Sequence, residues 1–114
     1  MTQTNPIVSN ERFQSAEQLW FWFLYSRQMR ATRMLHRGGN PTRRPCEVLD
    51  VETLITRLYL AGKLTDTQLE IMKQFGDKKR APHQYIWAEN RAAAQWNIAM
   101  SVLEDAAKQR GWIE

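Results

Sequence analysis

Arginines are the residues whose type and spacing point most directly to chemistry in this chain of 114 residues. Intervals of three, three and four residues separate the first four members of a cluster that comprises Arg27, Arg30, Arg33, Arg37, Arg43 and Arg44. On a helix, this spacing stacks the side chains along one face. Guanidinium groups suit phosphate because their planar donors bind two oxygens at once. The cluster therefore predicts a surface that binds nucleic acid independently of sequence and with strong salt dependence.

The charge distribution supports a second basic cluster. Residues 18–46 contain six arginines and no acidic residue, residues 47–77 carry a net charge of −3, and residues 78–91 carry +3. The second cluster is formed by Lys78, Lys79 and Arg80. The alternative is that these cations form a solvated face or pair with the acidic middle segment.

Catalytic and metal-binding patterns are nearly absent from the sequence. His36, His83 and Cys46 have no partners at metal-ligand spacing, and neither a phosphate-binding loop nor a dinucleotide-binding fingerprint occurs. We therefore expect no enzyme activity, no metal and no cofactor. The single cysteine excludes an internal disulfide, and the polar first ten residues do not resemble a signal peptide, which together favour a cytoplasmic location.

The pattern of apolar residues predicts the first of several helices. Seven consecutive apolar residues, 19–25, follow a capping box that begins at Ser15, and glycines at 38 and 39 mark the end of the helix. A strand is the alternative for so short a run, but the flanking caps favour a helix. Apolar side chains then point in every direction, so the run is either buried on all sides or covered by a partner.

Three more helices complete the predicted fold. Asp50 is the expected N-cap of the second, and Thr65 and Gln68 form a capping box before the third, which Gly76 is expected to end. The last helix carries apolar residues at alternating intervals of three and four from Ala93 to Ala107. We predict an all-α bundle with helices at about 15–37, 50–61, 66–75 and 83–110. Residues 1–14 are expected to form a flexible arm and 15–114 a single domain.

Helices two and three also resemble a helix-turn-helix in a generic way, over about residues 51–75. The pattern departs from that motif at Leu58, where a small residue is expected, at Lys63, where an apolar one is expected, and at Gln68, which falls on a buried position. A helical hairpin used only for packing is the favoured interpretation.

Burying the aromatic run within only four helices is difficult, which favours self-association, for example as a dimer. The predicted interface comprises Trp20, Phe21, Trp22, Phe23 and Tyr25 with Ala93, Trp96, Met100 and Leu103. Aromatic residues beside arginines also suit base stacking in single strands or a membrane interface, but a core role for the run outranks both.

These observations together predict a small basic protein that binds nucleic acid, DNA in preference to RNA. A transcriptional regulator or accessory factor fits this description. The alternative is a homo-oligomeric adaptor or structural protein, which would bind protein partners through the aromatic first helix and the alanine-lined last helix.

Overall fold

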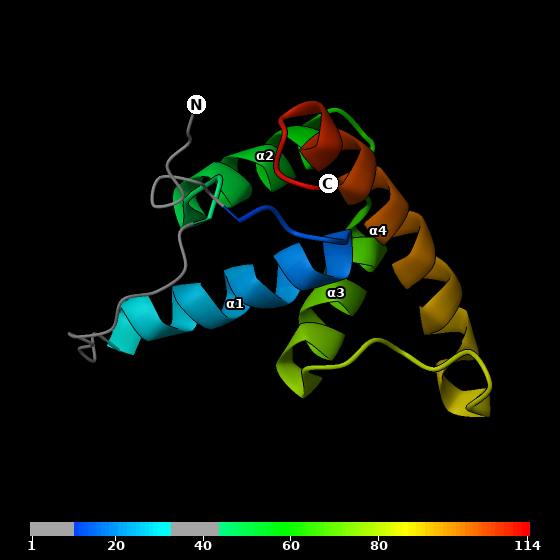
Figure 1. Ribbon diagram of the computed structural model, residues 1–114. Helices are drawn as coiled ribbons and strands as arrows, with labels where there is room; N and C mark the ends of the chain where they lie inside the picture. The colour runs from blue at the N-terminus through cyan, green and yellow to red at the C-terminus, as the bar shows by residue number, and fades with distance from the viewer. Residues whose placement is uncertain (1–10, 33–43) are drawn as a thin grey trace, which may run out of the picture.

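The computed structural model describes residues 11–32 and 44–114. Within these residues the chain forms four α-helices, α1 (Ala16–Thr32), α2 (Val48–Leu60), α3 (Asp66–Lys78) and α4 (Asn90–Gln109) (Figure 1). A short 3-10 helix, η2 (Trp87–Glu89), precedes α4. The all-α, four-helix prediction is confirmed.

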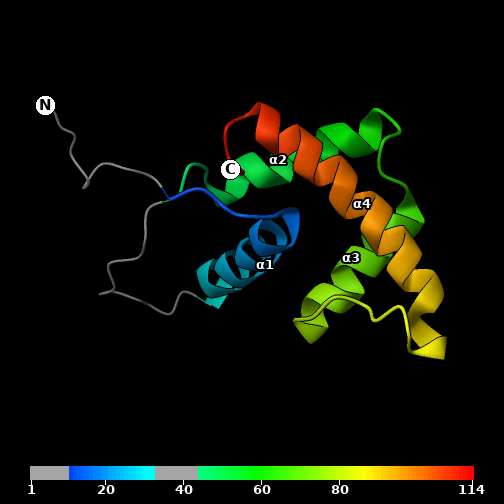
Figure 2. The ribbon, with the colours of Figure 1, turned by 45° about the vertical axis from the view of Figure 1, so that its right-hand side comes forward.

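Helix α1 is covered by the other three helices, since it packs against α2, α3 and α4 (Figure 2). Leu19, Trp20 and Phe23 are buried, while Phe21 and Trp22 are half-buried against the same core. The ring of Phe21 stacks on Trp96 of α4 at a centroid distance of 5.8 Å. The apolar run is thus largely buried within one chain, with Tyr25 at its end exposed.

The predicted apolar stripe on α4 is also buried. Trp96 and Leu103 are fully enclosed, and Ala99 beside them allows close approach of the neighbouring helices. The Trp96 indole N–H donates to Glu17 Oε2 at 2.8 Å, which joins α4 to the first turn of α1. Because polar partners are available for the indole, a large aromatic residue can occupy this position without a buried unsatisfied donor.

The capping box at the start of α3 forms as predicted. The Thr65 hydroxyl accepts from the Gln68 backbone N–H, and the Gln68 side chain accepts from the Thr65 N–H, both at 3.1 Å. Gln68 is buried, and its amide donates to Gln95 Oε1 on α4 at 3.0 Å. At the start of α2 the cap lies earlier than predicted, at Glu47, whose N–H donates to Asp50 Oδ2 at 2.8 Å.

Two predicted helix boundaries are wrong. Gly76 does not end α3, which continues to Lys78 with Lys79 in a left-handed conformation (φ 61°). Gly76 is buried instead against Leu24 and Trp20 of α1, so its missing side chain serves close packing rather than capping. The last helix begins at Asn90 and not at His83, because the His83 N–H donates to the Glu89 side chain and the segment between them forms a turn and the short helix η2.

Part of the predicted first helix and the loop after it fall outside the described residues, including positions 33–43. Of the predicted arm, residues 11–14 are described, and Phe13 is buried. Its N–H donates to Trp112 O and its carbonyl accepts from Glu114 N–H, each at 2.9 Å. The two ends of the described chain are therefore held side by side (Figure 1).

Helices α2 and α3 are joined by a short turn at Gly62 (φ 78°) and then diverge, with α3 packed on α4 and α1 (Figures 1 and 2). This divergence leaves space between them above α1. Among the described residues, no helix combines the length and apolar character needed to cross a membrane.

Candidate functional site

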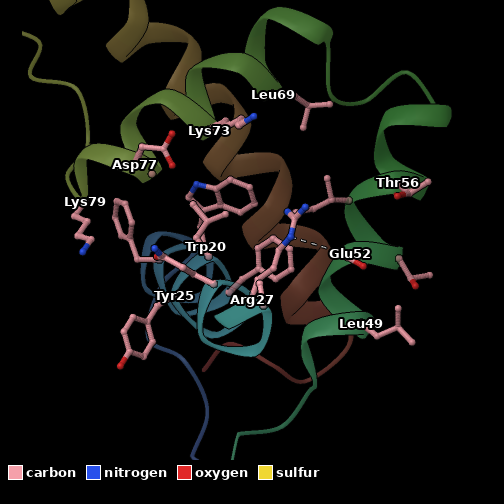
Figure 3. Close-up of a pocket in the computed structure, with 18 of the residues that line it drawn as sticks. Trp20, Tyr25, Arg27, Leu49, Glu52, Thr56, Leu69, Lys73, Asp77 and Lys79 are labelled. Atoms are coloured by element: carbon pink, nitrogen blue, oxygen red, sulfur yellow. Dashed lines mark ion pairs between the residues drawn. The ribbon is translucent and has the colours of Figure 1, made fainter. Parts of the chain in front are cut away.

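A groove of about 1380 Å³ lies between α2 and α3, with α1 as its floor (Figure 3). Trp20, Phe21 and Leu24 of α1 supply apolar floor, while Ile55 of α2 and Leu69 of α3 line the sides. The groove forms because α2 and α3 each pack against α1 but diverge from each other. Its location makes it a three-helix feature that no single sequence segment encodes.

Cations from all three helices surround this groove. They are Arg27 on α1, Arg57 on α2, and Lys73 and Lys79 on α3 and at its C-cap. Glu52 and Asp77 are the acidic residues in the lining. Arg27 belongs to the first basic cluster of the sequence and Lys79 to the second, so the fold brings a member of each to one site.

Arg27 and Glu52 approach each other across the groove, with the Arg27 Nε atom 3.6 Å from Glu52 Oε2 (Figure 3). Both side chains are about half exposed, so water screens the pair and its contribution to stability is small. A phosphate group could compete for this guanidinium at little cost, because an exposed pair gains little energy.

The other predicted phosphate-binding residues have different surroundings. Arg30, Lys78 and Lys79 are exposed. Arg44 is partly buried: it donates to the Glu11 carbonyl at 3.2 Å, and its guanidinium lies 4.5 Å from the Phe13 ring centroid. The remaining members of the first cluster, Arg33, Arg37 and Arg43, lie outside the described residues.

Arg80 is held within the molecule by Glu89. Its two terminal nitrogens donate to the two Glu89 carboxylate oxygens at 2.9 and 2.6 Å. Such a bidentate pair fixes the guanidinium plane. Arg80 therefore has a partner within the molecule, and its predicted contact with phosphate stays a prediction.

The predicted interface residues lie mostly in the core. Ala93, Trp96, Met100 and Leu103 are buried by helices of the same chain, as are Trp20 and Phe23. Phe21 and Trp22 are half-buried, and only Tyr25 is well exposed, at 59%. The buried members offer no surface to a partner, so an interface through the first helix is reduced to Tyr25 and the edges of its half-buried neighbours.

A second surface feature, which the sequence interpretation missed, is the segment 81–89, termed here the aromatic loop. It exposes Tyr85 (83%) and Trp87 (86%), the two most exposed of the tyrosine, tryptophan and phenylalanine side chains that the structure describes. The sequence prediction placed both residues inside the last helix, which was expected to begin at His83, and so did not identify them as an exposed loop. One feature of the sequence indicates that the helix begins later than His83. The apolar stripe of α4 does not continue before Ala93, since the position seven residues before Trp96 is the charged Glu89.

The aromatic loop is fixed by the Glu89 carboxylate. Besides Arg80, this carboxylate accepts from the His83 backbone N–H at 2.8 Å. The Arg80 guanidinium and the His83 N–H lower the pKa of Glu89 to about 2. Within the loop, the Tyr85 N–H donates to His83 Nδ1 at 3.2 Å, and the two rings lie 5.7 Å apart.

Cys46 is not an activated thiol. It is buried, and desolvation, with the negative charges of Asp50 and Glu47 adding to it, raises its pKa to about 12. A thiol with so high a pKa holds its proton at neutral pH and is a poor nucleophile. In the described part of the chain, no group of three or more histidine, cysteine or acidic residues could hold a metal ion.

Comparison with protein-family models, with curated proteins and with solved structures found no match for this chain. The groove and the aromatic loop are the two surface features from which a function can be inferred.

Proposed function

We propose that the protein binds nucleic acid, with the phosphates contacting the cations around the groove. The supporting observation is the convergence of Arg27, Arg57, Lys73 and Lys79 from three helices on one groove. Against these four cations the lining holds two carboxylates, so the site carries net positive charge. A polyanion gains affinity from several such contacts at once through release of its counterions.

The set of phosphate-binding residues differs from the one that the sequence alone suggests. Arg44 and Arg80 have partners within the molecule, so the proposal gives the main phosphate contacts to the cations of the groove. Arg57 and Lys73 enter the set from the acidic segment of the sequence, because the fold places them on the groove. Arg30 is exposed one helical turn beyond Arg27 and extends the same surface along α1.

The proposal includes DNA as the preferred ligand and an accessory or regulatory role in transcription. These finer assignments rest on the basic character of the chain, since α2 and α3 depart from the helix-turn-helix pattern. The exposed face of α3 carries Thr67, Glu70 and Lys73, and the glutamate among them disfavours base reading by this helix. Selection of bound sequences from a random duplex pool tests these assignments: an enriched sequence supports base reading, and no enrichment limits the role to phosphate binding.

The experiment that tests phosphate binding is fluorescence anisotropy of labelled duplex DNA, titrated at several salt concentrations. The variant R27Q/K73Q/K79Q removes three cations from the groove. A matched control, K63Q/K108Q/R110Q, removes three exposed cations that are not part of the groove lining. Both variants have the same net charge, so a difference between them reports position and not total charge.

The groove variant is expected to weaken duplex binding and to flatten the salt dependence by up to about 0.9 in log–log slope per lost contact. The control is expected to behave nearly as the unmodified protein. Equal effects of both variants would show that the groove is not the binding surface. Absence of binding to any nucleic acid at low salt would overturn the proposed function.

A second candidate function is that of an adaptor that binds a helical protein segment in the groove. Its apolar floor favours this, together with two exposed apolar side chains in the lining, Tyr25 (59%) and Leu49 (65%). The volume exceeds the range of about 300–1,000 Å³ usual for small-molecule sites and suits the apolar face of a helix. A second copy of the chain is one such partner.

Light scattering across a concentration series tests self-association through the groove. A dimer that L49E dissociates supports the groove as the interface, and a concentration-independent monomer excludes self-association there.

A further inference from the structure

Trp87 and Tyr85 present nearly their whole side chains to solvent in the aromatic loop. Exposed aromatic side chains carry an unfavourable hydration free energy that binding can recover. Single exposed apolar residues are common on protein surfaces, but this loop places Tyr85, Ile86 and Trp87 consecutively. Three consecutive exposed apolar residues therefore indicate a surface that binds a ligand.

The loop holds these rings in a defined position. The Arg80–Glu89 pair ties the end of α3 to the start of α4, and the His83 N–H is bound to the same carboxylate. The Ile86 N–H donates to His83 O at 3.1 Å, and the Glu89 N–H donates to Ile86 O at 2.8 Å, so hydrogen bonds bracket the exposed segment on both sides. A ligand that contacts the rings loses little affinity to ordering the loop.

The segment that carries the rings is rich in cations. Between residues 78 and 91 the chain has four cations and one acid, Glu89, which Arg80 neutralises. Lys78 lies close enough to Glu89 to lower its pKa, which places a second cation at the base of the loop. Lys79, at the C-cap of α3, lines the groove and connects the loop to the proposed phosphate-binding surface.

We propose that the aromatic loop is a base-stacking site for single-stranded nucleic acid, in which Tyr85 and Trp87 stack on unpaired bases while Lys78 and Lys79 contact the adjoining phosphates. The inference rests on the proposed function and specifies its ligand. Bases have aromatic faces that stack on tyrosine and tryptophan without regard to sequence. In a duplex those faces are already stacked on neighbouring bases, so the loop distinguishes single strands from duplexes.

The same rings could in principle insert into an anionic membrane surface. The composition of the loop favours nucleic acid, since Ile86 is its one large aliphatic side chain and it is only about half exposed, at 45%. Interfacial binding depends on a broad apolar area. Two exposed rings in a segment that also carries cations instead suit a strand that alternates bases and phosphates.

The test measures affinity for a labelled single-stranded oligonucleotide and for the matched duplex, by anisotropy in the same buffer. W87A and Y85A are each expected to weaken single-strand binding about 5- to 150-fold, the fold-change that corresponds to loss of one base–aromatic stack. W87F and Y85F keep a ring and are expected to stay within about 3-fold of the unmodified protein. I98A removes a half-exposed apolar side chain from α4 and serves as control.

A second measurement reports ring contact directly. Stacking on a base quenches tryptophan emission, so the oligonucleotide is expected to quench the unmodified protein and to quench W87F much less. Because both rings are exposed, the substitutions are expected to leave the helices intact, which circular dichroism checks.

Unchanged single-strand affinity of W87A and Y85A, with normal duplex binding, would overturn this inference and leave the proposed function standing. Loss of vesicle binding by W87A, measured with phosphatidylserine-containing vesicles, together with unchanged oligonucleotide binding, would overturn it in favour of a membrane surface. No binding of the unmodified protein to single strands or duplexes would overturn both the proposed function and the inference.

Discussion

Gly76 determines how closely α3 approaches α1. A Cβ atom at this position would collide with Leu24 Cδ1 and would lie 3.2 Å from Trp20 Nε1. The indole cannot retreat freely, since its N–H donates to the Met72 carbonyl at 2.9 Å. A glycine within a helix costs about 1 kcal/mol relative to alanine. A glycine occurs at this position because the absence of a side chain leaves room for Leu24 and Trp20.

The variant G76A tests this explanation. The gain in helix propensity opposes the collision, and we expect a net destabilisation of about 1–2 kcal/mol in urea unfolding because overpacking dominates. Removal of the obstructing side chain supplies the control: in an L24A background, G76A is expected to cost less, so the double mutant is destabilised by less than the sum of the two single substitutions. Stabilisation by G76A in both backgrounds would show that the contact with α1 is not tight.

Glu89 makes the order of the aromatic loop depend on pH. Its pKa in the folded protein, about 2, lies below the ordinary value of 4.5. The stabilising contribution of the carboxylate is therefore fully present above about pH 4.5 and is lost as the pH falls from about 4.5 towards 2. Amide hydrogen exchange at His83, which donates to this carboxylate, is expected to lose protection over that range.

Two glutamate variants separate this effect from general acid unfolding. E89Q is expected to reduce protection at His83 already at neutral pH. E104Q, which removes an exposed pair with Lys108 on α4, is expected to leave it unchanged. Protection at His83 that is identical in E89Q and in the unmodified protein would contradict the assigned role of the carboxylate.

At the scale of elements, sequence periodicity predicts those features that depend on neighbours along the chain. The apolar stripe of α4 and the Thr65–Gln68 capping box both form as expected, because each is defined within a few residues. The end of α3 and the start of α4 could not be predicted in the same way. The glycine at position 76 does not end α3, because it serves close packing against a side chain of α1. The residues before α4 are non-helical because the Glu89 carboxylate binds Arg80.

The capping box provides a test at this scale. T65A removes the hydroxyl that accepts from the Gln68 N–H, and we expect it to lower the free energy of unfolding by about 1 kcal/mol, within a range of about 0.5–2. T67A lies in the same turn on the exposed side and is expected to change stability by less than about 0.5 kcal/mol. Equal effects of the two substitutions would show that the cap contributes nothing specific.

At the scale of the whole molecule, α1 explains both what could and what could not be predicted. Its apolar run indicates burial on all sides or cover by a partner, and three helices of the same chain cover most of the run while Tyr25 stays exposed. The groove could not be predicted, because Arg57 and Lys73 are isolated cations in an acidic segment and only the fold places them beside Arg27. Charge runs along a sequence identify basic segments but not the cations that converge from different helices.

The pairing of Phe13 with the last residues of the chain joins segments that are far apart in sequence. Phe13 is fully buried, its ring lies 5.2 Å from that of Trp22, and its backbone bonds to residues 112 and 114. This contact packs Phe13 against α1 at Trp22. If it is part of the cooperative core, its loss must destabilise the entire bundle and not only the chain end.

F13A is therefore expected to lower the free energy of unfolding by about 3–5 kcal/mol, as for other buried phenylalanines. Small domains have about 5–15 kcal/mol in total, so the variant is expected to approach the limit of folding. F13L, which keeps most of the volume, is the milder comparison, and Q14A, with its exposed side chain, is the control.

Urea unfolding followed both by circular dichroism and by tryptophan emission measures the effect of F13A. Coincident transitions, shifted together in F13A, would show that the chain ends and the helices unfold as one unit, whereas a loss below about 1 kcal/mol would show that the pairing is peripheral to the core.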